Sequence, residues 1–392
     1  MNRMPALLAA GAAAFALVST ASSQPEPGDA LSAAGNFAVA GSAYEATLAA
    51  SPGDASALAG LARVRLYENK VDEAIALAQK ALAANPASPV ARATLGVGQQ
   101  RKAAFGGDLY KITGAPAETV VPFAVTDPLP VVQITIGGRK AWFLIDTGAP
   151  DIMVGADIAK ELGLPVQDAG QGVFAGGQRA AIQRTVVPEI QLGGVKIANV
   201  PAGVRPGGGL QVPGYKIEGF VGTGLLMHFL STLDYCQGRL ILRPRSASAA
   251  FEQAASKGGA NVVPFWLVGD HFMMARAHLQ HGSEGTFLID TGLAGGGVSA
   301  PKATLDDAGV VIDPAKASTG LGGGGEVTVI PFRAGATLGS LTVEDMPGFY
   351  TPGGDAMSVF PFKASGLLSH MLFRHSRLTF DFEAMKLVTE AC

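Results

Sequence analysis

The sequence lacks an excess of charge of either sign. Its 29 Lys and Arg residues nearly balance 32 Asp and Glu residues, the net charge is −3, and only 16% of the 392 residues are charged. Proteins that bind nucleic acid usually carry a basic surface that neutralises phosphates. The composition therefore argues against a nucleic-acid partner. The length fits two to three domains, and 48% apolar residues are enough for a sizeable core.

The sequence also lacks the motifs of several enzyme classes. Its six His residues form no HExxH zinc motif, and no GxSxG nucleophile elbow occurs. The glycine run from Gly322 to Gly325 has neither the Lys nor the Ser of a phosphate-binding loop. His278 and His281 fit a polar hairpin better than a zinc site. We therefore expect no metal and no cofactor.

Cysteine is scarce. The two that occur, Cys236 and Cys392, lie in or just past segments that are predicted to close the two halves of a β region. They could pair in an oxidising compartment. A lone buried thiol in each half fits the sequence at least as well.

Long apolar runs are missing except near the N-terminus. Arg3 precedes an Ala-rich apolar run from Leu7 to Val18, and small residues follow at Ser19-Thr20-Ala21. This order is typical of a signal peptide over residues 1–23. A membrane anchor is the alternative, but a span needs about 20 apolar residues. We expect an exported protein, periplasmic or secreted in the bacterial manner, with no stable membrane span after signal cleavage.

Residues 28–105 are rich in Ala and Leu and predict helices. Leu48-Ala49-Ala50-Ser51-Pro52 returns 34 residues later as Leu82-Ala83-Ala84-Asn85-Pro86, and helix patterns cover about 54–68 and 71–84. This period resembles that of tetratricopeptide repeats. The resemblance implies a candidate site for a protein partner, because such repeats often bind peptide segments. With at most two repeats, a helical cap or spacer packed beside the next domain is favoured.

The strongest pattern is a repeated hexapeptide. Phe143-Leu144-Ile145-Asp146-Thr147-Gly148 returns 144 residues later as Phe287-Leu288-Ile289-Asp290-Thr291-Gly292. In each copy an apolar run ends in Asp-Thr-Gly. This order predicts a buried strand that delivers a carboxylate to a tight turn.

The flanks of the two hexapeptides repeat as well. Val154 and Val298 each follow the Asp by eight residues, and a short helix pattern closed by Gly comes next in both copies. Later segments that predict strands also match, 190–197 with 336–343 and 233–242 with 380–388. A duplication of this length predicts two pseudo-symmetric β lobes, which we set at residues 106–248 and 249–392.

From about residue 120 onward the chain resembles a two-lobed aspartic protease built from retropepsin-like halves. Besides the two Asp-Thr-Gly turns, Gly219-Phe220-Val221-Gly222 is similar to the apolar-apolar-Gly loop that follows the active-site strand in that family. The resemblance implies a mainly β acid-protease fold, an aspartic endopeptidase, a peptide or unfolded protein substrate, and no cofactor. With the N-terminal helices the chain is predicted to be multidomain.

The resemblance assigns Asp146 and Asp290 as the catalytic pair. Hydrolysis without a metal or a covalent nucleophile needs a base that activates water and an acid that protonates the carbonyl oxygen. Two adjacent carboxyls can fill both roles if they share one proton, because both cannot ionise cheaply at close range.

Supporting residues are expected around this pair. By resemblance, Thr147 and Thr291 hydrogen-bond across to the opposite loop and hold the carboxylates coplanar. Gly148 and Gly292 permit the turns and let backbone and substrate approach closely.

Two glycine-rich stretches are candidates for a mobile flap over the substrate cleft. One includes Phe174, Gly176 and Gly177, and the other includes Gly322 and Gly323. An ordinary surface loop explains either stretch about as well.

The second half departs from the family pattern in two places. Its counterpart of the Gly219–Gly222 loop reads Phe362-Lys363-Ala364 or Ala364-Ser365-Gly366, which predicts a degraded support for the second turn. The two turns are followed by Ala149 and Leu293, neither of which can donate a hydrogen bond to a carboxylate as a hydroxyl residue would. We therefore expect the pair to hold its proton to higher pH, with activity in mildly acidic or neutral conditions.

Two functions remain open at the level of sequence. The first is an active endopeptidase. The second is a catalytically inactive protein of the protease fold that binds peptides or proteins, with the helices as its adaptor. Both Asp-Thr-Gly turns are intact, which favours the enzyme. If the helices are separable, a chain that begins near residue 106 should still cleave small peptides.

Overall fold

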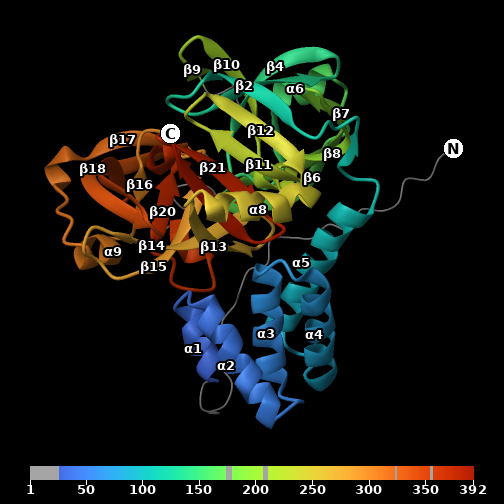
Figure 1. The fold of residues 1–392 in the computed structure, drawn as a ribbon, viewed down its shortest axis with the longest axis vertical. Coiled ribbons are helices and arrows are strands. Elements are labelled where there is room, and N and C mark those ends of the chain that lie inside the picture. The colour runs from blue at the N-terminus through green and yellow to red at the C-terminus, as the bar shows by residue number, and fades with distance from the viewer. Residues whose placement is uncertain (1–25, 174–178, 206–210, 323–324, 354–355) are drawn as a thin grey trace.

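The computed structural model describes residues 26–392 except 174–178, 206–210, 323–324 and 354–355. N-terminal helices stand against a larger β region in which two halves lie side by side (Figure 1). The predicted mainly β fold with an N-terminal helical region is confirmed. Within the described ranges, no helix is both long and apolar enough to cross a membrane. The predicted signal peptide at 1–23 lies outside the described residues.

The N-terminal region is a row of packed helices. They are α1 (Pro27–Ala33), α2 (Phe37–Ala50), α3 (Ala55–Tyr67), α4 (Val71–Ala84) and α5 (Pro89–Gly106). Asp54 caps α3 by accepting a hydrogen bond of 2.8 Å from the backbone N–H of Ala57. Small residues such as Ala62, Ala74 and Ala78 are fully buried, so the helices approach one another closely. The helices α3 and α4 match the two predicted helix patterns.

The first half of the β region begins after α5. Its strands are β1 (Lys111–Thr113), β2 (Thr119–Val125), β3 (Val131–Ile136), β4 (Arg139–Ile145), β5 (Ile152–Gly155), β6 (Gln167–Val173), β7 (Arg179–Leu192), β8 (Val195–Arg205), β9 (Gln211–Val212), β10 (Tyr215–Val221), β11 (Phe229–Asp234) and β12 (Arg239–Pro244). Short helices α6 (Ala156–Glu161) and α7 (Thr223–Leu226) interrupt them. Alternation along β3 places Val132, Ile134 and Ile136 in the main core.

The second half follows η2 (Arg245–Ala247) and α8 (Ser248–Lys257). Its strands are β13 (Asn261–Val268), β14 (Phe272–Leu279), β15 (Gly285–Asp290), β16 (Val298–Ser299), β17 (Ser318–Gly322), β18 (Gly325–Leu338), β19 (Leu341–Tyr350), β20 (Gly366–Ser369), β21 (Ser376–Asp381) and β22 (Lys386–Ala391). The short helical elements are α9 (Lys302–Asp307), η3 (Pro314–Lys316), η4 (Ala356–Val359) and η5 (His370–Phe373).

The two halves share one antiparallel sheet in the order β2–β12–β11–β21–β22–β13. The central pair is β11 with β21, in which Ser231 lies opposite Phe380. Every residue of β11 is buried. Backbone hydrogen bonds within a buried sheet therefore fix one half relative to the other.

An apolar cluster joins the helices to the second half. We call it the interface cluster, and its buried members are Phe37, Tyr67, Trp266, Val268, Met274, Leu288, Phe360, Phe362, Ala364 and Leu367. The centroid of the Phe37 ring lies 5.1 Å from that of Tyr67, 5.6 Å from that of Trp266 and 4.8 Å from that of Phe362. These edge-on contacts are a favourable aromatic geometry. The helical region is thus packed against the β region through a core of its own.

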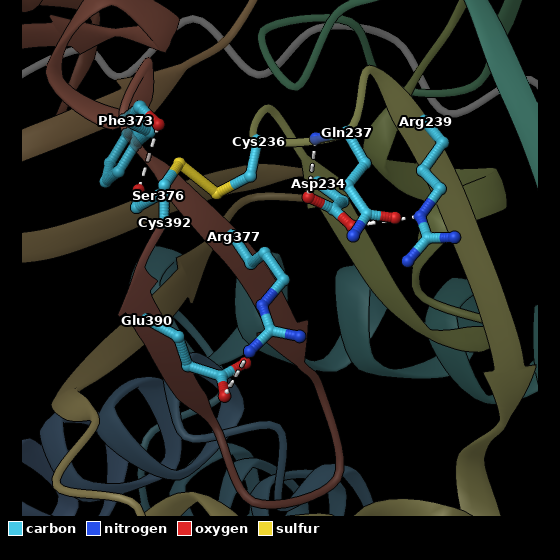
Figure 2. Close-up of a disulfide and its surroundings, with 9 residues drawn as sticks. All are labelled: Asp234, Cys236, Gln237, Arg239, Phe373, Ser376, Arg377, Glu390 and Cys392. Atoms are coloured by element: carbon cyan, nitrogen blue, oxygen red, sulfur yellow. Dashed lines mark hydrogen bonds and ion pairs between the residues drawn. A yellow bond between two sulfur atoms is a disulfide. The ribbon is translucent and has the colours of Figure 1, made fainter.

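A disulfide ties the end of the sequence to the first half. Cys236 and Cys392 are bonded, their Cα atoms lie 5.4 Å apart, and 156 residues separate them in sequence. Figure 2 shows the bond together with the nearby Asp234–Arg239 and Arg377–Glu390 ion pairs. Of the two alternatives that the sequence leaves open, the structure has the paired form.

Removal of this disulfide should lower the free energy of unfolding by up to about 5 kcal/mol, because a cross-link across a long loop restricts the unfolded chain. Chemical denaturation of the Cys236→Ser/Cys392→Ser double variant measures this loss. Reductant should lower the denaturant concentration at which the wild type unfolds toward that of the variant, and it should leave the variant's own value unchanged. A double variant that unfolds at the wild-type denaturant concentration would contradict the expectation.

Candidate active site

The two Asp-Thr-Gly turns stand at the ends of buried strands. β4 runs into Asp146, and β15 ends at Asp290. The apolar residues before the aspartates, 143–145 and 287–289, are at most 4% exposed. Each strand is flanked by an antiparallel hairpin partner, β3 or β14, and by a parallel strand, β10 or β20. Both copies of the hexapeptide therefore form the strand and turn that the sequence predicts.

The support for the second turn differs from the prediction. β10 pairs Phe220 with Leu144, and β20 pairs Leu367 with Leu288 in the same parallel arrangement. The counterpart of the Gly219–Gly222 loop is therefore Gly366-Leu367-Leu368-Ser369, and the alignments with Phe362-Lys363-Ala364 and Ala364-Ser365-Gly366 are wrong. The error arises because a Gly is expected at the end of this loop, where the chain has Ser.

This second loop is well supported. The Ser369 hydroxyl donates a hydrogen bond of 2.8 Å to the Gly296 carbonyl and accepts one of 3.0 Å from the Met371 backbone N–H. Its side chain is fully buried. The expected degradation of the loop is therefore also wrong, because a hydroxyl group takes over part of the loop's hydrogen bonding.

Thr147 and Thr291 link the two turns by reciprocal hydrogen bonds. The Thr147 hydroxyl donates to the Ile289 carbonyl (2.9 Å) and accepts from the Thr291 N–H (3.0 Å). The Thr291 hydroxyl donates to the Ile145 carbonyl (3.1 Å) and accepts from the Thr147 N–H (3.1 Å). Both threonines are fully buried. The contacts are those that the resemblance implies, and they hold the two turns face to face.

Each turn glycine lies against the carboxyl of the opposite turn. A Cβ atom on Gly148 would lie 2.7 Å from Asp290 Oδ2, and one on Gly292 would lie 2.1 Å from Asp146 Oδ1. The backbone N–H of each glycine also donates to the carboxylate of its own turn, at 2.9 Å for Asp146 and 2.8 Å for Asp290. The close approach requires glycine at both positions.

Burial raises the pKa of both carboxyls, and the charge of Asp290 raises that of Asp146 further. Loss of water is the largest cause for Asp146 and the charge of Asp290 is the second, so the pKa of Asp146 lies well above its usual range. Burial also raises the pKa of Asp290. The hydrogen bonds from the Gly292 N–H and from Asp146 and the positive charge of His271 lower this pKa, but by less than burial raises it. Both aspartates keep partial exposure to solvent. The pair can therefore hold one proton between two carboxyls that a substrate can reach.

His271 is a residue of this site that the sequence reasoning missed. Its Nε2 lies 3.1 Å from the carbonyl oxygen of Gly148, and its Nδ1 lies 2.5 Å from Asp270 Oδ1. The side chain is buried, at 7% exposure. The only signal in the sequence is its position in the turn before β14. His278, which the sequence singles out, instead contacts the nearby Gln280 carbonyl at 2.9 Å.

The candidate flap residues lie mostly outside the described residues. This holds for Phe174, Gly176, Gly177 and Gly323, whereas Gly322 ends β17 and pairs with Gly325 of β18. The flanking strands pair as hairpins, β6 with β7 and β17 with β18. A flap at either hairpin remains a prediction. Among the described residues, no cluster of three or more His, Cys, Asp or Glu side chains is arranged to hold a metal ion.

Comparison with known proteins gives two family matches. Residues 132–225 match the family model of aspartyl proteases, and residues 31–96 match that of tetratricopeptide repeats. Among solved structures, the chain is similar to the crystal structure of a retropepsin-like aspartic protease from Rickettsia conorii, with 19% sequence identity and a TM-score of 0.24. That match covers 35% of this chain and 96% of the other. A search of curated proteins finds no match. The chain thus joins a region that matches tetratricopeptide repeats to a region that matches aspartyl proteases.

Proposed function

We propose that the protein is an aspartic endopeptidase in which Asp146 and Asp290 form one catalytic pair, each contributed by one β half. The reciprocal hydrogen bonds of Thr147 and Thr291 carry this proposal. They bring together two turns that are separated by 144 residues and set each carboxyl against the other turn. The raised pKa of both carboxyls supports a shared proton.

The chemistry needs one ionised and one protonated carboxyl. The ionised carboxyl takes a proton from water as the water oxygen bonds to the peptide carbonyl carbon, and the protonated carboxyl gives its proton to the carbonyl oxygen. The tetrahedral intermediate then collapses: the carboxyl that took the proton from water gives it to the nitrogen, a hydroxyl of the intermediate gives its proton to the other carboxylate, and the C–N bond breaks. The products are a carboxylic acid and an amine, and the pair returns with one proton. No bond between enzyme and substrate forms.

We further propose that the substrate is a peptide or an unfolded protein and that the enzyme acts outside the cytoplasm. The signal-peptide pattern at 1–23 supports export, and the Cys236–Cys392 disulfide suits an oxidising compartment. The match to tetratricopeptide repeats supports a protein partner at the helical region.

Incubation of the full chain with a denatured protein tests this function. New peptide termini, detected by mass spectrometry, should accumulate and should disappear when a statine-type transition-state analogue is added. Binding of the denatured protein without new termini would overturn the endopeptidase and favour the inactive peptide-binding alternative.

A further inference from the structure

A buried arginine connects the helical region to the turn that carries His271. Arg101 of α5 is 5% exposed. Its guanidinium donates to the Gly269 carbonyl at 2.6 Å and to the Leu267 carbonyl at 3.3 Å, and on its other side to the Leu66 carbonyl at 2.6 Å. Burial lowers the pKa of Arg101 to about 10, so the group remains charged at neutral pH. The turn between β13 and β14 is thus clamped from outside the β region.

The clamped turn presents His271 to the first catalytic turn. Nδ1 faces the Asp270 carboxylate and Nε2 faces the Gly148 carbonyl, at 2.5 and 3.1 Å. An ionised carboxylate and a carbonyl oxygen only accept hydrogen bonds. Both contacts are therefore satisfied together only when both ring nitrogens carry a proton, which is the imidazolium form.

An imidazolium at this place acts on the carboxyls around it. Burial alone would raise the pKa of Asp270. The charge and the hydrogen bond of His271 instead hold this pKa below its usual range. The charge of His271 also lowers the pKa of Asp290. The ionisable groups that face this junction from the surrounding elements are Arg101, Tyr110, Asp151, Arg184, Asp270 and Asp290. A cavity of about 50 Å³ borders four of them, which leaves room for water but not for a substrate.

We propose that His271 is a positioning residue for the catalytic pair: an imidazolium, held by Asp270 and by the turn that Arg101 clamps, which fixes the Gly148 carbonyl and favours one ionised carboxyl. A hydroxyl donor next to either turn would also stabilise an ionised carboxyl, but this chain has Ala149 and Leu293 at those positions. The inference rests on the proposed endopeptidase function. It also gives the helical region a direct mechanical link to the active site.

His271→Gln tests the inference by activity. Glutamine can still donate to the Gly148 carbonyl but carries no charge. The ionised carboxyl loses a stabilising positive charge, so the acid limb of the kcat/KM profile should move to higher pH by on the order of one unit, an approximately tenfold loss of rate on that limb. His278→Gln, the same change within β14 and away from the site, should leave the limb in place. A folded His271→Gln variant with the wild-type acid limb would overturn the proposal.

A second measurement does not depend on cleavage or on the variant. Nitrogen NMR of the imidazole rings in the full-length wild type should show both ring nitrogens of His271 protonated when the Asp270 contact is formed. A neutral ring with one protonated nitrogen at the pH of maximal cleavage would overturn the proposal. If the wild type cleaves no peptide, the endopeptidase function fails by itself, and this spectrum, recorded at neutral pH, still decides the state of His271.

Discussion

Asp146→Asn and Asp290→Asn should each lower kcat/KM for peptide cleavage by at least about a thousandfold. Asparagine keeps an acceptor for the N–H of the turn glycine, so the hydrogen bonds from Gly148 and Gly292 can persist and the fold should survive. What is lost is the ability of two carboxyls to share one proton. The loss should be equally severe in the two variants, because neither carboxyl can serve as acid and base together.

Asp157→Asn is the matched control for these variants. Asp157 lies exposed in the first turn of α6, close in sequence to the catalytic turn but outside the site. The same substitution there should change the rate less than twofold, as for most surface changes. Retention of more than a tenth of the wild-type rate by either catalytic-site variant, with its circular dichroism spectrum unchanged, would rule out the two-carboxyl mechanism.

A chain that begins at Gly107, without the helices, should fail to fold stably and should not cleave peptides. Removal of α2 and α3 would uncover Trp266 and Phe362, which are 7% and 8% exposed in the intact protein. Burial of one large apolar side chain contributes about 1.5–3 kcal/mol, and total stabilities of domains are only about 5–15 kcal/mol. The sequence alone predicts separable helices, whereas the interface cluster predicts the opposite result.

Polar contacts strengthen this expectation. The truncated chain would lose the acceptor of the Lys363 N–H, which is the Ala33 carbonyl at 2.7 Å, and the Arg101 clamp on the His271 turn. A chain that begins at Glu26 keeps every described helix and is the control. Thermal denaturation and cleavage of a short peptide compare the two. A folded, monomeric chain from Gly107 with the wild-type cleavage rate would show that the helices are an adaptor only.

The sequence predicts local elements of this protein well because their patterns are local. The repeated apolar run before each Asp-Thr-Gly turn indicates β4 and β15, and the 34-residue spacing indicates α3 (Ala55–Tyr67) and α4 (Val71–Ala84). The same patterns place Asp146 and Asp290 at the ends of their strands. Only the three-dimensional structure shows that the two turns meet.

Features that depend on contacts between distant segments are less accessible to sequence reasoning. The sequence pattern misplaces the β20 loop because Ser369 replaces the expected glycine and supplies a hydroxyl in its place. Neither the interface cluster around Phe37 nor the contact of His271 with Gly148 has a periodic signal, because each joins residues far apart in the chain. The Cys236–Cys392 pair likewise depends on the shared sheet that brings the ends of both halves together.

The pH dependence of kcat/KM for a short peptide tests the shared proton most directly. Activity requires one protonated and one ionised carboxyl, so the rate should fall at low pH, where both are protonated, and at high pH, where both are ionised. Because burial and mutual repulsion raise the pKa of Asp146 and burial raises that of Asp290, the profile should be bell-shaped with its maximum above about pH 4, in the mildly acidic to neutral range. A maximum near pH 3 or below, or a rate that keeps rising into alkaline solution, would contradict a pair that shares one proton in this buried site.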